Sequence, residues 1–216
     1  MIAVIKYNAG NIRSVENALN RIGASCVVTD NIEEIQKAEK VILPGVGEAS
    51  TAMEYLKSKK LDVVLKNLKQ PVLGICLGLQ LMCDSSEEGD KSPPDPKGGS
   101  SNPPSGVGGQ TTCLGIFDTN VKLFPPKEIV PQMGWNGLTH IKGSLFKGVT
   151  ENDDMYFVHS YYAELCEDTA AICDYIVPFS AAFQKNNFFA TQFHPEKSGA
   201  VGEIILKNFL KTTLPL

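Results

Sequence analysis

Long apolar runs and paired cysteines are both missing from this sequence of 216 residues. No stretch is long enough to span a membrane, and none of the six cysteines lies in a C-x-x-C pair. The three histidines and the cysteines also lack the spacing of zinc ligands. These absences argue against a membrane protein and a structural metal site, and we expect neither a metal nor a cofactor.

A basic stretch before the apolar start is missing too, so residues 1–6 are predicted to form a strand rather than a signal peptide. We therefore expect a cytoplasmic protein, or one carried into an organelle by a segment not present here, with mostly free thiols. Charge is nearly balanced, since 20 basic and 24 acidic residues give a net charge of -4. That balance gives no general electrostatic reason to bind nucleic acid or an anionic membrane.

Short apolar segments alternate with segments of helical periodicity in the first half of the chain. The sequence predicts strands at 1–6, 26–29, 41–43 and 72–75, and helices at 12–22, 49–68 (with a break near Leu61) and 77–83. Asn11 is a candidate N-cap of the first helix. The alternation predicts an α/β fold with a mostly parallel central sheet flanked by helices. Continuous apolar strands such as 41–43 fit a sheet that is covered on both faces.

The second half of the chain is richer in strands. They are predicted at 114–123, 154–158, 170–177, 181–185 and 188–193, before a last helix that follows Ser198. We expect one domain over residues 1–216. It is interrupted at about 90–110 by a Pro-, Gly- and Ser-rich segment whose only aliphatic core-former is Val107. This composition predicts a flexible loop, because it buries too little surface to offset the entropy of ordering.

A cysteine stands in the small-residue turn Gly74-Ile75-Cys76-Leu77-Gly78, between a predicted strand and a predicted helix. A nucleophile on such a turn is exposed at the sheet edge. The unpaired N–H groups at the start of the following helix can stabilise a thiolate or an oxyanion. A buried structural cysteine is the alternative, and the local pattern does not decide between the two.

His194 and Glu196 follow the predicted strand 188–193, again at a strand end. A thiol nucleophile needs a base, and the base needs an orienting group. Because residues two apart in an extended segment face the same side, Glu196 can orient His194. Together with Cys76 they form a candidate triad, whereas alone they also fit a surface pair before a helix.

The turn Pro44-Gly45-Val46-Gly47 ends the predicted strand 41–43. The carboxyl ends of parallel strands share one edge of the sheet, so this turn and Cys76 are expected to be neighbours. Its backbone N–H groups could hold an oxyanion, although a simple turn before a helix would have the same composition.

Together these residues resemble the class I (triad) glutamine amidotransferases, and more narrowly the glutaminase subunits of imidazole glycerol phosphate synthase. The resemblance covers nearly the whole chain except the segment at about 90–110. Its more specific marks are Met133-Gly134-Trp135-Asn136 and His159-Ser160-Tyr161-Tyr162. Members of the family pass almost directly from the equivalent of Glu88-Gly89 to that of Thr112, so the intervening segment is a departure.

The resemblance implies that Cys76 attacks the side-chain amide of glutamine, while His194 moves protons and Glu196 orients the imidazolium. Ammonia leaves, and water hydrolyses the thioester to glutamate. The backbone N–H groups of Gly47 and Leu77 would form the oxyanion hole. The residues implied to bind glutamine are Gln80, Glu88, Ser160 and Tyr161.

The resemblance also implies a partner, a (β/α)₈-barrel cyclase subunit that uses the ammonia to make imidazole glycerol phosphate in histidine biosynthesis. The chain itself has no G-x-x-x-x-G-K-[ST] phosphate-binding loop. Low glutaminase activity is expected in the absence of the partner. The residues assigned to the partner interface are Asn11, Met133, Trp135 and Lys197.

Three other functions stay open from the sequence alone. The chain could serve another synthase, such as those for anthranilate, purines or pyridoxal phosphate. It could hydrolyse another γ-glutamyl bond, or it could be an inactive or rewired binding scaffold. The departure at about 90–110 could be a natural insertion, an engineered linker or a segment placed there to test or alter function. Because it lies beside Glu88, its effect on glutamine binding is open as well.

Overall fold

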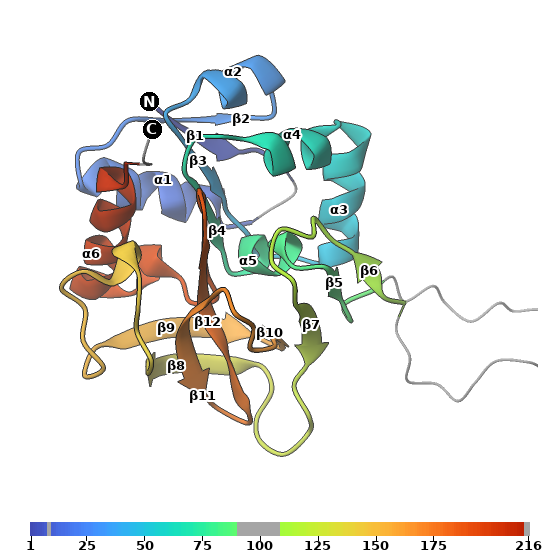
Figure 1. Cartoon of the computed structure of the whole chain (residues 1–216), viewed down its shortest axis with the longest axis vertical. Coiled ribbons are helices and arrows are strands. Elements are labelled where there is room, and N and C mark those ends of the chain that lie inside the picture. The colour runs from blue at the N-terminus through green and yellow to red at the C-terminus, as the bar shows by residue number, and fades with distance from the viewer. Residues whose placement is uncertain (8–9, 90–108, 214–216) are drawn as a thin grey trace, which may run out of the picture.

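The computed structural model describes residues 1–7, 10–89 and 109–213. Its main feature is a seven-stranded sheet in the order β11-β12-β13-β4-β3-β1-β2, with helices on both faces (Figure 1). The strands of this sheet are β1 (Ile2–Ile5), β2 (Cys26–Thr29), β3 (Lys40–Leu43), β4 (Val72–Ile75), β11 (Thr169–Asp174), β12 (Pro178–Lys185) and β13 (Phe188–Thr191).

Neighbouring strands from β2 through β1, β3 and β4 to β13 are all parallel. Only β12 and β11, at the other edge, pair in an antiparallel manner. The predicted α/β fold with a mostly parallel central sheet is therefore confirmed. Because parallel strands end at one edge, the segments that follow β3, β4 and β13 are brought together there.

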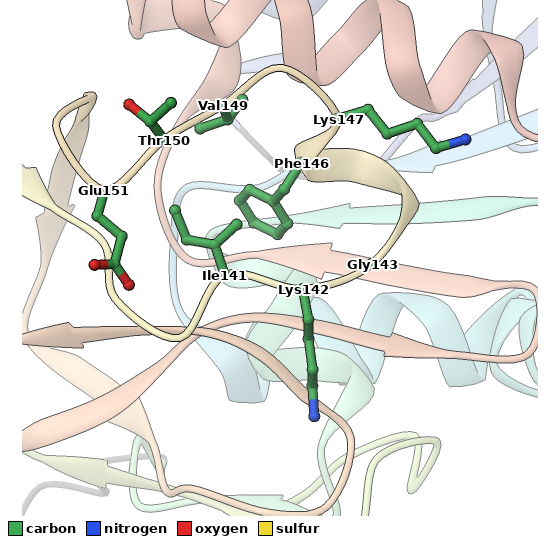
Figure 2. Close-up of a pocket in the computed structure, with 8 residues that line it drawn as sticks. All are labelled: Ile141, Lys142, Gly143, Phe146, Lys147, Val149, Thr150 and Glu151. Atoms are coloured by element: carbon green, nitrogen blue, oxygen red, sulfur yellow. The ribbon is translucent and has the colours of Figure 1, made fainter.

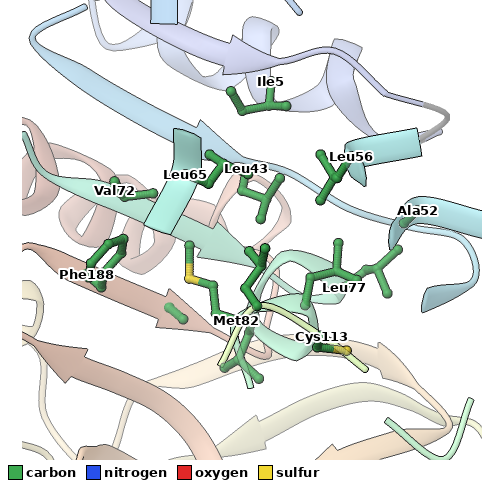
Figure 3. Close-up of a cluster of buried hydrophobic side chains, with 14 of the residues drawn as sticks. Ile5, Leu43, Ala52, Leu56, Leu65, Val72, Leu77, Met82, Cys113 and Phe188 are labelled. Atoms are coloured by element: carbon green, nitrogen blue, oxygen red, sulfur yellow. The ribbon is translucent and has the colours of Figure 1, made fainter. Parts of the chain in front are cut away.

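Helices cover both faces of this sheet. They are α1 (Ile12–Arg21), α2 (Ile32–Lys37), α3 (Ala49–Ser58), α4 (Leu61–Asn67), α5 (Leu77–Met82) and α6 (Gly199–Lys211). Side chains of β1 alternate between the two faces, since Ala3 and Ile5 pack with α2 to α5 while Ile2 and Val4 pack with α1 and α6. Figure 3 shows the first of these clusters, with Leu56 of α3 beside the sheet residue Leu43. Burial on both faces explains why the strands are continuously apolar.

Smaller sheets lie at the carboxyl edge of the large one. A four-stranded sheet has the order β10-β7-β5-β6, and β8 pairs with β9 as an antiparallel ribbon. Their strands are β5 (Ser85–Ser86), β6 (Thr111–Thr112), β7 (Asn120–Leu123), β8 (Gln132–Gly137), β9 (Asp154–His159) and β10 (Tyr161–Ala163), and short 3₁₀ turns occur at Ser144–Phe146 and Pro195–Lys197. In the described residues no helix is long and apolar enough to cross a membrane.

Several local predictions need correction. The strand predicted at 114–123 is observed only over β7 (Asn120–Leu123). Residues 114–117 do not join a sheet, because their N–H groups donate to carbonyl groups of residues 81–83 at the end of α5. Helix α2 and strand β8 were not predicted; α2 begins where the Asn31 side chain accepts the N–H groups of Glu33 and Glu34. The break predicted near Leu61 is confirmed between α3 and α4. The loop predicted at about 90–110 lies outside the described residues, except for its end at 109–110.

Candidate active site

Cys76 occupies a strained turn between β4 and α5. Its backbone angles are φ 53° and ψ -105°, a region that costs a residue with a Cβ atom about 1–3 kcal/mol. The Cys76 N–H donates to the Thr191 carbonyl at 2.7 Å, which fixes the turn to the neighbouring strand β13. The sulfur thus sits at the carboxyl edge of the sheet, where the sequence pattern predicts it.

Two glycines allow α5 to start directly on top of the sheet. A Cβ atom on Gly78 would lie 2.0 Å from the Leu43 carbonyl oxygen, and one on Gly74 would lie 2.8 Å from the Gly78 backbone. No side chain fits at either position without moving the backbone. The glycines of the Cys76 turn therefore serve the close packing of helix against strand, as the sequence pattern indicated.

His194 and Glu196 form a buried pair beyond the end of β13. The His194 Nδ1 atom lies 2.7 Å from Glu196 Oε1, and neither side chain is accessible to solvent. The backbone of His194 is held on both sides, because its N–H donates to the Tyr156 carbonyl at 2.9 Å and its carbonyl accepts the Ser198 hydroxyl at 2.7 Å. The Nε2 atom is buried and makes no hydrogen bond within the described chain. With Nδ1 committed to Glu196, Nε2 is the nitrogen left to exchange protons.

The charges of this pair are set by their neighbours. Burial opposes a charged imidazole, but the Cys76 thiolate and the Glu196 carboxylate outweigh it and raise the pKa of His194 to about 10. Burial likewise opposes the carboxylate, yet hydrogen bonds and charge from His194, with a further hydrogen bond from Asn11, lower the pKa of Glu196. The arrangement therefore favours a charged imidazolium beside a charged Glu196 carboxylate.

Asn11 belongs to this buried cluster rather than to a surface. Its side-chain amide donates to Glu196 Oε1 and lies 3.2 Å from His194 Nδ1. The residue is only 3% exposed, and its side chain makes no cap hydrogen bond to α1. Asn11 thus occupies the predicted N-cap position, but its side chain does not cap the helix. The amide nitrogen instead donates to the Glu196 carboxylate, which holds the side chain in the buried cluster. Its assignment to the partner interface stays a prediction.

A cavity of about 230 Å³ opens beside the Cys76 sulfur. It includes every residue that the resemblance assigned to the oxyanion hole and to glutamine. The cavity is lined by Val46, Gly47, Cys76, Leu77, Gln80, Glu88, Pro131, Val158, His159, Ser160 and Tyr161. The Glu88 carboxylate accepts the Ala49 N–H at 2.9 Å, at the start of α3, and burial raises its pKa. A carboxylate in the same cavity as the nucleophile suits the ammonium group of an amino acid.

The turn from Pro44 to Gly47 is tied down by its carbonyl groups. The Gly45 carbonyl accepts the Leu77 N–H and the Val46 carbonyl accepts the Gly10 N–H, both at 3.4 Å. Gly47 itself has φ 137°, a conformation that favours glycine. Because the Leu77 N–H already has the Gly45 carbonyl as a partner, an oxyanion bound there would have to displace that carbonyl.

Two buried glutamines connect the cavity to the nucleophile. Gln80 is 4% exposed, and its Nε2 atom donates to the Tyr161 carbonyl at 3.0 Å and to Gln192 Oε1 at 3.1 Å. Gln192 is fully buried, and its Nε2 atom lies 3.5 Å from the Cys76 sulfur. Sequence reasoning missed Gln192, although its position two residues before His194 on an extended segment was a signal for the same side of the chain.

An exposed patch lies on the ribbon β8–β9 and the neighbouring 3₁₀ turn Pro195–Lys197. We call it the Trp135 patch and define it as Met133, Trp135, Tyr156 and Lys197. Met133 and Trp135 are 66% and 55% exposed. The Trp135 ring meets the Tyr156 ring edge-on at 5.8 Å, and Lys197 Nζ lies 5.9 Å from the Tyr156 ring centre. The sequence analysis assigned Met133, Trp135 and Lys197 to the partner interface, and it did not include Tyr156. The patch adjoins the triad, because the Tyr156 carbonyl binds the His194 N–H.

A second cavity, of about 380 Å³, is lined by residues 141–143, 146, 147 and 149–151. In Figure 2, Ile141 and Phe146 point into the loop, whereas Lys142 and Lys147 extend away from it. Since its charged groups do not converge, this cavity offers no arrangement of reactive groups comparable to that around Cys76.

Comparison with known protein families and proteins gives a consistent result. The family model for "Glutamine amidotransferase class-I" matches residues 3–213. Imidazole glycerol phosphate synthase subunit HisH of Bacteroides fragilis is 55% identical over 213 residues, which cover 97% of this chain and 98% of that protein. The subunit of the same name from Dehalococcoides mccartyi is 40% identical over 220 residues, covering 99% of this chain and 98% of that protein.

Solved structures share the fold at lower identity. A glutamine amidotransferase superposes with a TM-score of 0.69 at 16% identity, over 98% of both chains. A protein of Thermoplasma acidophilum described as a GMP synthase component superposes with a TM-score of 0.68 at 18% identity, over 97% of this chain and 92% of the other. At such identity these two structures support the fold alone.

Proposed function

This chain belongs to the class-I glutamine amidotransferase family, and on that premise we propose how its residues carry out the reaction and with which partner. Its function is that of the glutaminase subunit of imidazole glycerol phosphate synthase in histidine biosynthesis. We take residues 1–216 as one amidotransferase domain. The six cysteines are free thiols, which supports a reducing compartment such as the cytoplasm.

The reaction begins with the Cys76 proton on His194 Nε2, the charged state of the imidazole that its raised pKa favours. The sulfur attacks the side-chain carbonyl carbon of glutamine, and the carbonyl electrons move to oxygen. The Gly47 and Leu77 N–H groups stabilise this oxyanion, which displaces the Gly45 carbonyl from the Leu77 N–H. His194 returns the proton to the leaving nitrogen, and ammonia departs from the thioester. Water, deprotonated by His194, then attacks the thioester carbon, and the sulfur leaves with its electron pair as glutamate forms.

One observation carries this proposal: the strained Cys76 turn shares a cavity with the Glu88 carboxylate, beside the buried His194–Glu196 pair. Glu88 binds the α-amino group of glutamine, and backbone groups of Ser160 and Tyr161 complete the binding of its amino-acid end. Gln80 stands in the same cavity, but both hydrogens of its amide group already have protein acceptors. Its contribution to glutamine binding is therefore indirect.

The partner is a (β/α)₈-barrel cyclase that receives the ammonia. The Trp135 patch supports this docking surface, because an exposed tryptophan and methionine beside a lysine are typical of interface anchors. The Tyr156 backbone binds that of His194, so a partner on the patch also touches the element that positions the base. Partner-dependent glutaminase activity follows from this connection.

The catalytic proposal is tested by measuring ammonia release from glutamine, with and without the cyclase partner and its nucleotide substrate. Wild-type activity should be low alone and rise with the loaded partner. Cys76→Ala should lose at least about 10³-fold, since the nucleophile is gone. Cys26→Ser, which alters a thiol on the edge strand β2, is the control and should retain activity. Ammonia release that persists in Cys76→Ala would refute the mechanism.

The docking surface is tested by titrating Trp135→Ala with the cyclase partner. Truncating a tryptophan anchor should weaken binding by about thirtyfold or more, because such residues contribute about 2 kcal/mol or more. Val63→Ala is a matched control, since Val63 is 59% exposed on α4 and lies outside the patch. Equal affinity of the wild type and Trp135→Ala would remove the patch from the interface.

A further inference from the structure

We infer that Gln192 donates a hydrogen bond to the Cys76 sulfur during catalysis, and that Gln80 is a positioning residue that holds Gln192 in the donating orientation. The inference deepens the proposed function and rests on it. It concerns a residue just beyond β13 that no sequence motif had marked.

The contact is direct and fully enclosed. Gln192 is 0% exposed, and its Nε2 atom lies 3.5 Å from the Cys76 sulfur, within the range of hydrogen bonds to sulfur. Its backbone N–H donates to the Ala181 carbonyl at 2.8 Å, which fixes the start of the side chain. A buried amide beside a reactive sulfur is costly unless each of its polar atoms has a partner. Both polar atoms of Gln192 have one here.

The orientation of the amide follows from a chain of hydrogen bonds. The Tyr161 carbonyl can only accept, so the Gln80 amino group must face it. That amino group donates its second hydrogen to Gln192 Oε1, with 3.1 Å between the Gln80 nitrogen and this oxygen. Since the oxygen of Gln192 is committed to Gln80, its amino group must point to Cys76. Gln192 therefore presents a donor to the sulfur, and the Val158 carbonyl, 3.9 Å away, is the acceptor available to the thiol proton.

A second residue secures the start of this chain. His159 Nδ1 lies 2.7 Å from the same Tyr161 carbonyl. Burial lowers the pKa of His159 to about 4, so its ring is neutral at pH 7 and donates through Nδ1. Because the Tyr161 carbonyl accepts from both His159 and Gln80, the donor-to-acceptor direction of this series of hydrogen bonds is fixed before glutamine binds.

A donor at this place stabilises the Cys76 thiolate at both stages of the reaction in which it forms. When Cys76 gives its proton to His194, the thiolate gains a charge-assisted hydrogen bond from Gln192. When water expels the sulfur from the thioester, the same hydrogen bond stabilises the departing thiolate. Gln192 transfers no proton in either step, and the His194–Glu196 pair retains the acid–base work.

The test is the rate of Cys76 alkylation by iodoacetamide in the full chain, followed by mass spectrometry of the peptide that contains Cys76, from pH 5 to pH 10. Gln192→Met, which removes the donor at similar volume, should lower the rate at pH 7 by about 10- to 100-fold and move the pH profile upward. Gln192→Glu, which keeps the shape but presents a carboxylate, should lower it further. Gln80→Met should show part of the loss.

Gln80 and Gln192 should also behave as one unit. The double variant Gln80→Met with Gln192→Met should be no slower than Gln192→Met alone, because the orienting residue acts only through the donor. Thr191→Val is the matched control: it removes the buried hydrogen bond from Thr191 to the Phe193 carbonyl in the same segment. It should lower the melting temperature without moving the alkylation profile.

Wild-type alkylation rates and pH profiles in folded Gln192→Met or Gln192→Glu would overturn the inference. If the methionine variant does not fold, the isosteric glutamate variant decides. Because alkylation requires neither glutamine nor a partner, this failure is separate from failure of the proposed glutaminase function. Ammonia release that depends on Cys76, with alkylation indifferent to Gln192, would retain the function and discard the donor.

Discussion

Glycine at position 76 should give a more stable protein than alanine, although either change removes the nucleophile. The reason is the Cys76 backbone, whose φ of 53° and ψ of -105° suit a residue without a Cβ atom. The strain of such a conformation is about 1–3 kcal/mol. Alanine keeps it and glycine relieves it.

The expected size follows from two opposing effects. Relief of the strain favours glycine, while its greater freedom in the unfolded chain disfavours it by about 0.5–1 kcal/mol. With the strain near the middle of its range, about 2 kcal/mol, and an unfolded-chain cost of about 0.75 kcal/mol, the net gain over alanine is about 1.3 kcal/mol. For a chain of this length each kcal/mol shifts the melting temperature by about 2–4 °C, so Cys76→Gly should melt about 2.5–5 °C above Cys76→Ala.

Calorimetry and urea denaturation of both variants provide the assay, and neither variant should release ammonia from glutamine. Cys83 offers the matched control, because it is fully buried and has an ordinary φ of -74°. There the order should reverse, with Cys83→Ala more stable than Cys83→Gly. If Cys76→Ala melted at or above Cys76→Gly, the turn would hold no strain and the reasoning from its dihedral angles would fail.

Two further predictions concern the triad and the inserted segment. In Glu196→Gln, kcat should fall by about 10²- to 10⁴-fold, and the imidazole of His194 should lose its proton at a lower pH than in the wild type, since the carboxylate helps to raise its pKa to about 10. Protonation of His194 stabilises the fold fully below the pKa of the unfolded imidazole, and this stabilisation is lost as pH rises toward 10. In the variant the loss should therefore come at lower pH. NMR titration of His194 and denaturation at several pH values check both points, and an unchanged titration would contradict them. Deleting residues 91–107 should leave KM for glutamine within about twofold, because the backbones of Gly89 and Gly109 already touch. The shorter connection should stabilise the fold by about 1–2 kcal/mol, because less loop entropy is lost on folding. A large rise in KM in the ammonia assay would show that the segment takes part in binding.

Much of the fold was predictable because local pattern and tertiary structure agree in the first half of the chain. The apolar runs of β1, β3 and β4 become buried strands, that of β2 becomes a half-buried edge strand, and the glycine turn at Cys76 becomes a strand-to-helix elbow. Misses arose where backbone hydrogen bonds went to distant segments. The segment at 114–117 was predicted as a strand from its apolar residues, yet its N–H groups bond to the end of α5.

The residues of the candidate site likewise divide into those predicted from local motifs and those placed only by the fold. Cys76, His194 and Glu196 were predicted because each follows a strand in an identifiable motif. The buried contact of Asn11 was missed, since its position at a helix start gave no hint that a carboxylate 185 residues away would accept its amide. Tyr156 was missed because an aromatic residue inside a strand-like segment is ordinary until Trp135 is placed opposite it.

The sequence by itself determined most of the strand–helix alternation in the first half of the chain, the glycine-flanked turn and the chemical types of the candidate triad, because these depend on local periodicity and on residues close along the chain. Only the tertiary structure decided which polar groups meet. The carbonyl of Tyr161, the amides of Gln80 and Gln192 and the sulfur of Cys76 form one hydrogen-bonded chain from three distant segments. Such a chain depends on direction and on distances of about 3 Å, which sheet pairing fixes and local pattern does not.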